Sequence, residues 1–472
     1  MQIAFDNSYA RLPERFYTRQ SPAPVKAPAL IAFNEPLAAE LGISAPDHDA
    51  LAQMAAGNRL PDGAEPLAQV YAGHQFGGFS PQLGDGRAML LGEVVSEAGR
   101  FDIQLKGSGP TPYSRMGDGR AWLGPVLREY VVSEAMAALG VPTSRALAAV
   151  TTGEMVFREQ GALPGAILTR IAASHIRVGT FQFFAARRDI EGLKALFDYV
   201  VSRHYSDTSD PAELLEAVVA TQARLVTHWM AVGFIHGVMN TDNTTLSGET
   251  IDYGPCAFLD RYHPDTVFSS IDAQGRYSYA NQPRVLVWNM AQLATTLVPL
   301  MPDQDEAVEV FTRIVHAMPE QIETEWRQRF GEKIGLESAT AEDAGLINEL
   351  LSLMANGRAD FTNTFQALSH PDGTPRDQFL DPVAFDTWFK RWQTRLAQET
   401  EPYELMARVN PVFIPRNHRI EKMIAAALSG DYTPFERLMK VLAAPYDPQP
   451  DALDLMRPPV EAEIVRQTFC GT

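Results

Sequence analysis

Cysteine is scarce in this 472-residue chain, which contains only Cys256 and Cys470. Two thiols cannot build a framework of disulfides or a zinc site made of several cysteines. The sequence also lacks any apolar run of about 18 residues, the length that spans a membrane. Its first residues have neither the basic nor the apolar part of a signal peptide. We therefore expect a cytoplasmic protein without a membrane span.

Positive charge is in short supply as well. The chain has 40 Lys and Arg against 58 Asp and Glu, which gives a formal net charge of -18. This balance argues against nucleic acid as a partner. A site for an anionic nucleotide would have to gather its arginines and lysines locally. The length is sufficient for two or three domains, or for one large bilobal unit.

The segment 236–243 (HGVMNTDN), followed by Asp252-Tyr-Gly254, is the most informative part of the chain. Protein kinases place a catalytic Asp two residues after a His and a metal-binding Asn seven after it, with a second metal-binding Asp in a later D-F-G. His236, Asn243 and Asp252 keep that pattern. The residue two after His236 is Val238, which cannot accept a proton. The pattern thus predicts a metal site without the usual base.

The residues between these two motifs, 244–251, fit two short strands around a Ser-Gly turn. We expect such a hairpin to bring Asn243 and Asp252 together. The alternative is an ordinary hairpin that follows an Asx-turn and carries no chemistry.

The pattern of apolar residues changes along the chain. Residues 1–65 are rich in Pro and Ala and suggest an arm with one helix near 35–41. The next part, 66–185, predicts a small unit with strands at 88–95 and 101–105 and a helix at 124–140. The rest, 186–472, predicts a larger helical unit, with helices that include 211–234, 285–300, 305–330, 341–357 and 419–428. We therefore predict an α+β protein with a β-rich part followed by a mainly helical part.

Lys106 and Glu129 extend the kinase pattern. Lys106 closes the second predicted strand, and Glu129 lies on the predicted helix that follows. In a kinase fold, a strand lysine holds phosphates and pairs with a helix glutamate. For either residue alone, a solvated surface charge is the better interpretation. Their chain order, ahead of Asn243 and Asp252, favours the functional interpretation.

Two glycine-containing segments and several arginines are the remaining phosphate-binding candidates. Segments 82–87 and 115–120 allow backbone N–H groups to approach a phosphate, although neither is a Walker A loop and a plain turn is the alternative. Arg170 and Arg177 are seven residues apart and would share one face of a helix, or would converge on one polyphosphate from an irregular segment. Surface ion pairs are the alternative for any single one. The resulting cationic cluster contains Arg87, Lys106, Arg120, Arg170 and Arg177.

These motifs occur within long strings that resemble the selenoprotein O family, whose bacterial members are YdiU-type proteins. The strings are 5–16, 71–78, 104–115, 236–255 and 410–418. The resemblance implies a protein-kinase-like bilobal fold and an enzyme that moves AMP from ATP to Ser, Thr or Tyr hydroxyls of proteins, with release of pyrophosphate. It also implies that ATP binds end for end relative to a kinase. Extra arginines would then hold the β- and γ-phosphates as the leaving group.

The resemblance also implies roles for individual residues. Asn243 and Asp252 would bind Mg2+, with Mn2+ as a possible substitute, and Asp242 would be the general base. A carboxylate near a metal has a depressed pKa, so Asp242 would orient the hydroxyl more than deprotonate it. The residues implied to bind ATP are Gly84, Gly86, Arg87, Lys106, Asp118, Gly119, Arg170, Arg177 and Asp252, with Glu129 as the ion-pair partner of Lys106.

Other functions remain open at this level. A conventional protein or small-molecule kinase with a displaced base is one alternative, and a non-catalytic ATP-binding pseudokinase scaffold is another. UTP would compete with ATP if the site reads the base weakly. We expect a monomer that binds ATP and protein substrates, but neither nucleic acid nor membranes. The family often has a redox-active residue near its C-terminus, which Cys470 matches. Cys256 is its only available partner, and we interpret Cys256 as a small core residue instead.

Overall fold

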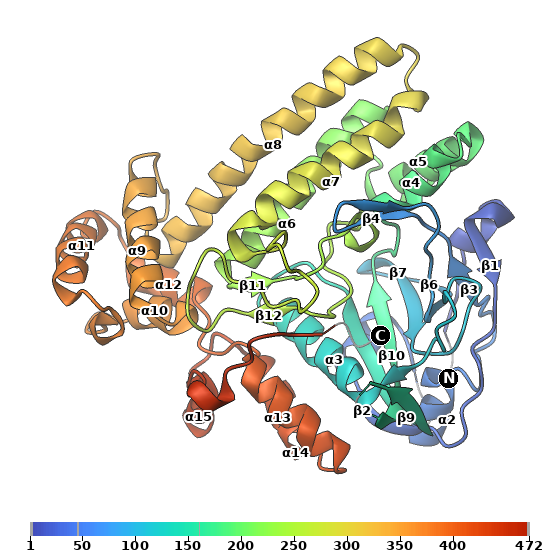
Figure 1. Ribbon diagram of the computed structural model, residues 1–472, viewed down its shortest axis with the longest axis horizontal. Coiled ribbons are helices and arrows are strands. Elements are labelled where there is room, and N and C mark those ends of the chain that lie inside the picture. Colours follow the sequence, from blue (N-terminus) through green and yellow to red (C-terminus); the bar gives the residue numbers. More distant parts are fainter. Residues whose placement is uncertain (1–2, 45–46, 160, 470–472) are drawn as a thin grey trace.

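An antiparallel sheet organises one half of the molecule in the computed structural model, which describes residues 3–44, 47–159 and 161–469 (Figure 1). Seven strands follow the order β1-β3-β6-β7-β10-β9-β2, and the short β8 pairs with β10. Their bounds are β1 Tyr17–Arg19, β2 Ala29–Phe33, β3 Leu67–Gln69, β6 Ala88–Ser96, β7 Gly99–Lys106, β8 Ala121–Trp122, β9 Arg145–Arg158 and β10 Gly161–Ala172. A separate hairpin consists of β4 Gly73–Gln75 and β5 Gly78–Ser80.

The two predicted strands form the middle of this sheet. They correspond to β6 and β7, whose register pairs Ala88 with Lys106 and Ser96 with Gly99. On its other side β7 pairs with β10, where Lys106 lies opposite Leu168. The first seven residues of β6 are buried, and so are the last five of β7, including the polar Asp102, Gln104 and Lys106. Lys106 is thereby held at the end of a central strand.

The predicted N-terminal arm contributes to the sheet itself. β1 pairs with β3, and β2 pairs with β9, so both edges of the main strand order come from the first 33 residues. The same region contains α1 Glu35–Glu40, close to the predicted helix, and α2 His48–Ala55, which was not predicted. The strands were missed because each is short and neither alternates clearly between apolar and polar residues.

α3 (Leu123–Ala138) is the predicted helix at 124–140 and crosses behind the sheet. It has buried residues around almost its whole circumference, including Glu129. That pattern requires neighbours on two sides. The sheet covers one side and the C-terminal helices α13 (Asn417–Leu428) and α14 (Thr433–Leu442) cover the other, with Tyr130 and Phe435 in edge-to-face contact at 5.5 Å.

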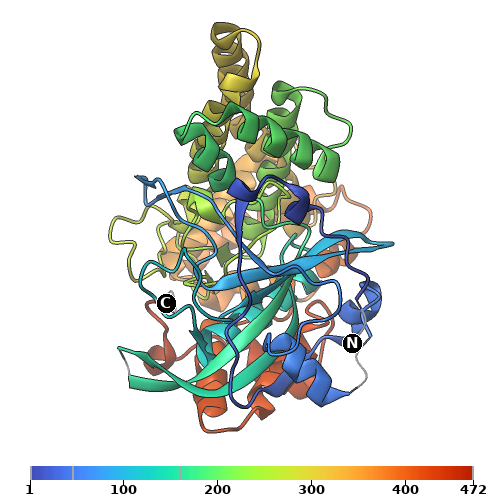
Figure 2. The ribbon, with the colours of Figure 1, turned by 90° about the vertical axis from the view of Figure 1, so that its right-hand side faces the viewer.

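Helices fill the other half, in which α6 (Pro211–Ala231), α7 (Gln282–Leu297) and α8 (Gln304–Lys333) lie along one another. Figure 2 shows the strands gathered in one half and helices from the middle of the chain standing above them. The predicted helices agree within a few residues, and the predicted α+β mixture is confirmed. The remaining bounds are α4 Val178–Ala186, α5 Ile190–His204, α9 Asp343–Gly357, α10 Phe361–Leu368, α11 Pro382–Leu396, α12 Pro402–Val409 and α15 Leu453–Met456.

A buried arginine ties the C-terminal helices to the rest of the protein. Arg416 precedes α13 and is only 1% exposed. Its guanidinium donates to Asp260 at 2.6 Å and to Asp360 at 2.9 Å. Buried charges of this kind persist because each has partners of opposite sign. The segment that follows the Asp252 motif is therefore fixed to the helical end of the chain.

None of the helices in the described residues combines the length and the apolar character that a membrane span needs.

Glu249 gives a testable link between this fold and pH. It accepts a hydrogen bond from the Ala173 N–H at 2.8 Å, and burial raises its pKa from 4.5 to about 7. Between these values the folded protein keeps a proton that the unfolded chain releases, so the free energy of unfolding falls as pH rises through this range. We expect Glu249→Gln to stabilise the protein at about pH 8 by roughly 1–2 kcal/mol, and by much less at about pH 5.

Denaturant unfolding at the two pH values measures this difference. Glu216→Gln, on an exposed position of α6, is the matched control and should change stability little at either pH. An equal effect of Glu249→Gln at both pH values would contradict the prediction.

Candidate active site

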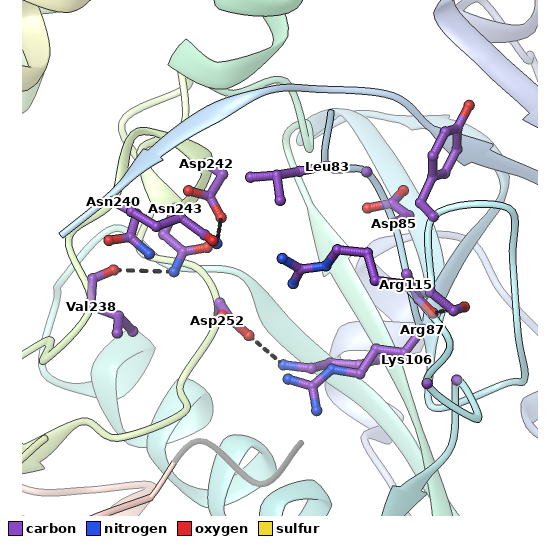
Figure 3. A pocket seen from close by; sticks show the side chains of 18 of the residues that line it. Leu83, Asp85, Arg87, Lys106, Arg115, Val238, Asn240, Asp242, Asn243 and Asp252 are labelled. Carbon is purple, nitrogen blue, oxygen red and sulfur yellow. Dashed lines mark hydrogen bonds and ion pairs between the residues drawn. The ribbon is translucent and has the colours of Figure 1, made fainter. Parts of the chain in front are cut away.

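A cavity of about 920 Å3 lies between the sheet and the segment 238–252. Its volume falls in the range of pockets that hold a small molecule the size of a nucleotide. Figure 3 shows Arg87, Lys106 and Arg115 on one side, Asp242 and Asn243 on the other, and Asp252 between them. The sequence-predicted residues that line this cavity are Gly84, Gly86, Arg87, Lys106, Asp118, Gly119, Arg120, Arg170, Arg177, Asp242, Asn243 and Asp252.

Lys106 joins the two sides of the site. Its Nζ lies 2.5 Å from Glu129 Oε2 and 2.6 Å from Asp252 Oδ1. Glu129, on α3, is buried behind the cavity rather than in its wall. Burial alone would raise the pKa of Asp252, but Lys106, Arg87 and Arg170 together hold it well below its ordinary value. Asp252 is therefore ionised throughout the physiological range.

Arg170 and Arg177 do not share a helix face, contrary to one of the two predicted arrangements. Arg170 lies on β10, where its Nε donates to Glu129 Oε1 at 2.9 Å. Arg177 precedes α4, and its guanidinium lies 4.3 Å from the centre of the Tyr71 ring and 3.7 Å from Asp85. The chain leaves β10 and turns at 173–177 before α4 begins, so the two arginines belong to different elements. Both still line the same cavity.

Both glycine segments pack against residues 109–114 beside the cavity. A Cβ at Gly84, whose φ is +143°, would meet the Tyr113 ring at 2.5 Å, and one at Gly119 would lie 2.1 Å from the Gly109 carbonyl oxygen. These glycines are thus required by close backbone packing as well as by any ligand. Asp118 lies at the rim and pairs with Arg158 at 2.8 Å. Arg120 donates to the carbonyls of Ala23 and Pro24, so it is tied to the N-terminal segment.

The expected hairpin at 244–251 is wrong. Thr245 pairs with Arg177, and Thr250 pairs with Thr143, so each side of this segment bonds to another part of the chain. The two motifs are instead brought together by β11 (Phe234–Ile235) and β12 (Ala257–Phe258), which pair as antiparallel strands outside the motifs. His236 reinforces this arrangement through a 3.0 Å hydrogen bond between Nε2 and the Ile251 carbonyl.

Asn243 and Asp252 present oxygens that suit a divalent cation. Asn243 Nδ2 donates to the Val238 carbonyl at 3.1 Å, and Asp252 Oδ1 is taken by Lys106. Asn243 Oδ1 and Asp252 Oδ2 take no part in these two hydrogen bonds. The described residues contain no group of three His, Cys, Asp or Glu that would hold a metal alone. Two side-chain oxygens completed by phosphate and water are the usual environment of Mg2+, so the residues fit this ion.

Asp242 is 8% exposed and lies beside Asn243 at the cavity wall. Burial raises its pKa to about 6, and a cation bound nearby would act in the opposite direction. Gln75 opposes that rise by donating from Nε2 to Asp242 Oδ2 at 3.1 Å. Val238, which stands where a kinase has its base, has only an apolar side chain to offer the cavity.

Several residues of the cavity were not predicted as site residues. They include Tyr71, Gln75, Asp85, Arg115 and Asn240. Tyr71 and Gln75 belong to the string 71–78, which is one of the segments that resemble the selenoprotein O family. The resemblance implied no role for either residue. No local pattern connects Gln75 with a residue so far along the chain.

Cys256 is buried, as expected for a small core residue, and burial raises the pKa of its thiol to about 12. A thiol held neutral in this way is a poor nucleophile. Cys470, the other half of the possible redox pair, lies outside the described residues.

A cavity with clustered cations, a paired lysine and two metal-suited oxygens is the kind of site that nucleotide-dependent transferases use. Comparison with known proteins agrees with that class and narrows it. The model of the family described as protein adenylyltransferase SelO matches residues 1–443. The chain belongs to this family, which makes it an enzyme of the nucleotidyltransferase class.

Individual relatives extend the match over the entire length. A protein of Ruegeria sp. (strain TM1040), named protein nucleotidyltransferase YdiU, is 63% identical over 473 residues and covers 100% of both chains. A protein of the same name from Roseobacter denitrificans is 65% identical, with 99% of each chain covered. One from Bradyrhizobium diazoefficiens is 56% identical over 100% of both chains.

Proposed function

We propose that this enzyme transfers AMP from ATP to hydroxyl groups of Ser, Thr or Tyr in other proteins, with Mg2+ as cofactor and ATP bound end for end relative to a kinase. The observation that supports it most directly is Lys106, which lies between Glu129 and Asp252 within one cavity. This is the arrangement of a phosphate-binding lysine in kinases, yet Val238 stands where their base would be. A protein-kinase-like bilobal fold, with an arm at 1–65, a β-rich lobe at 66–185 and a helical lobe at 186–472, accounts for this arrangement.

The proposed reaction is a displacement at the α-phosphorus of ATP. The acceptor hydroxyl oxygen forms a bond to this phosphorus, the bond from phosphorus to the bridging α,β-oxygen breaks, and pyrophosphate leaves with the electron pair. Asp242, whose side chain lines the cavity beside Asn243, accepts the hydroxyl proton. Asn243 and Asp252 would hold Mg2+, which neutralises phosphate charge when it is bound.

Positive side chains of the sheet half would stabilise the leaving group. Lys106, Arg87, Arg170 and Arg177 all line the cavity. In an acidic protein this local cluster offsets the unfavourable overall field for an anionic nucleotide. Pyrophosphate develops negative charge as the bond breaks, so fixed guanidinium groups at its oxygens lower the barrier. That role supports an orientation in which the β- and γ-phosphates face these residues.

Labelled nucleotides test the reaction directly. Purified enzyme with Mg2+ and α-labelled ATP is expected to label itself or proteins of a lysate, whereas γ-labelled ATP leaves them unlabelled. Label from the γ-position alone would identify a kinase instead. ATP-dependent thermal stabilisation without transfer of either label would identify a nucleotide-binding scaffold. Parallel reactions with Mn2+ and with α-labelled UTP define the preferred ion and donor.

A further inference from the structure

The β4–β5 hairpin reaches from the sheet half to the segment that contains Asp242 (Figure 1). The backbone N–H of His74 donates to Thr241 Oγ1 at 2.7 Å, and that of Phe76 donates to Asn240 Oδ1 at 3.1 Å. The hairpin is therefore bonded to the two residues immediately before Asp242. Its position is set by these backbone contacts, independently of the Gln75 side chain.

Two residues of the hairpin contact the Asp242 carboxylate itself. Gln75 donates from Nε2 to Oδ2 at 3.1 Å. Gly73 packs so closely that a Cβ at this position would lie 2.7 Å from Oδ1 and 2.9 Å from the Asp242 Cβ. Asp242 is thus confined on one side by the Gly73 backbone and held on the other by an amide.

The two carboxylate oxygens differ as a result. Oδ1 is buried and accepts no hydrogen bond from the described residues. A carboxylate oxygen deprived of solvent and of a donor is costly, so this rotamer needs other contacts to maintain it. Oδ2 is held by Gln75, and as the side chain lines the cavity it is the oxygen that an acceptor hydroxyl can reach.

We propose that Gln75 is a positioning residue, which acts through Asp242 by directing the carboxylate so that a remaining lone pair of Oδ2 faces the acceptor hydroxyl. The inference rests on the proposed function, in which Asp242 accepts the proton of that hydroxyl. Gln75 itself contacts neither the reacting atoms nor the phosphates in this scheme. Gly73 serves the same end, because its lack of a Cβ leaves the space that the Asp242 side chain occupies.

A second set of contacts supports the hairpin without Gln75. His74 Nδ1 accepts from Gln182 Nε2 at 2.8 Å, while Gln182 Oε1 accepts from Thr241 at 2.6 Å. The His74 ring also meets the Trp288 ring edge to face at 5.1 Å. Because these bonds remain when position 75 is changed, replacement of its amide should alter Asp242 rather than the fold.

Gln75→Met, which keeps the length of the side chain but removes the donor, tests the proposal. We expect kcat for α-label transfer to fall roughly tenfold to fiftyfold, because small displacements of a reacting group are costly. KM for ATP and the binding of a non-hydrolysable ATP analogue should change less than about twofold, because the phosphates do not depend on this amide. Gln304→Met, at an exposed position that begins α8, is the matched control.

The double variant separates positioning from a structural effect. In an Asp242→Ala background there is no carboxylate to hold, so adding Gln75→Met should reduce kcat less than about twofold. Equal losses in both backgrounds, or a loss expressed in KM and melting temperature, would overturn the inference. Gly73→Ala, which pushes Asp242 from the other side, should lower kcat as well and replaces Gln75→Met if that variant does not fold. Wild-type enzyme that transfers no α-label would overturn the proposed function together with this inference, whereas active wild type and an unimpaired Gln75→Met variant would overturn the inference alone.

Discussion

Asp252→Asn is expected to lower the rate of AMP transfer by about a thousandfold, because it removes the charged oxygen proposed to hold the metal. Asparagine is preferred to alanine for a structural reason. Asp252 has a φ of +61°, a left-handed conformation that asparagine tolerates and alanine resists. The variant also leaves Lys106 without one of its two carboxylate partners. Transfer of α-label to protein, measured at saturating ATP and Mg2+, gives the loss.

Asp265→Asn provides the matched control, since Asp265 is exposed in the loop that follows. It should retain wild-type activity. Thermal unfolding without nucleotide should show that Asp252→Asn is folded. In wild type, Mg2+ together with ATP should raise the melting temperature more than ATP alone, and this further rise should be absent in the variant. An Asp252→Asn enzyme with full activity would exclude the proposed metal site.

Lys106→Met is expected to reduce kcat/KM a few hundredfold, because it removes a cation that pairs with Asp252 and is proposed to bind the phosphates. The side chain is 9% exposed, and its Nζ is shared by Glu129 and Asp252 at 2.5 and 2.6 Å. In this variant Glu129 still accepts a hydrogen bond from Arg170, so its buried carboxylate remains paired with a positive charge. Binding of an ATP analogue should weaken along with transfer, which distinguishes Lys106 from Gln75.

Lys194→Met is the control for Lys106→Met, because Lys194 is exposed and pairs only with its helical neighbour Asp198. Circular dichroism and thermal unfolding should show both variants folded. Unchanged nucleotide affinity in Lys106→Met would refute a phosphate-binding role for the lysine.

The sequence predicts well whatever depends on local periodicity. Apolar residues at helical spacing placed α3, and Pro125 and Gly140 marked its ends to within two residues. The juxtaposition of Lys106, Glu129 and Asp252 was also anticipated, because a strand lysine, a helix glutamate and a later aspartate in this order form a known spatial pattern. Their roles in catalysis stay predictions until variants are measured.

Contacts between distant segments were harder to foresee. Thr245 and Thr250 lie in a segment with the alternation of a hairpin, but their backbones pair with Arg177 and Thr143. These partners are distant in the sequence, so the local pattern does not reveal them. Gln75 reaches Asp242 across 167 positions of the chain, so its role has no signature in either neighbourhood. The edge strands β1 and β2 are held in an extended conformation by pairing with β3 and β9. Each has too few residues for its own sequence to predict a strand.

Arg416 has a consequence for how much of the chain the enzyme needs. A version shortened before this position would leave the carboxylates of Asp260 and Asp360 facing each other in the interior with their shared cation gone. The β12 strand lies between Asp252 and Asp260 and ends two residues before Asp260, so this repulsion would disturb the loop that contains Asp252, the aspartate proposed to bind the metal. The C-terminal helices thus support the proposed active site, and removing them is expected to reduce activity even though they lie outside the cavity.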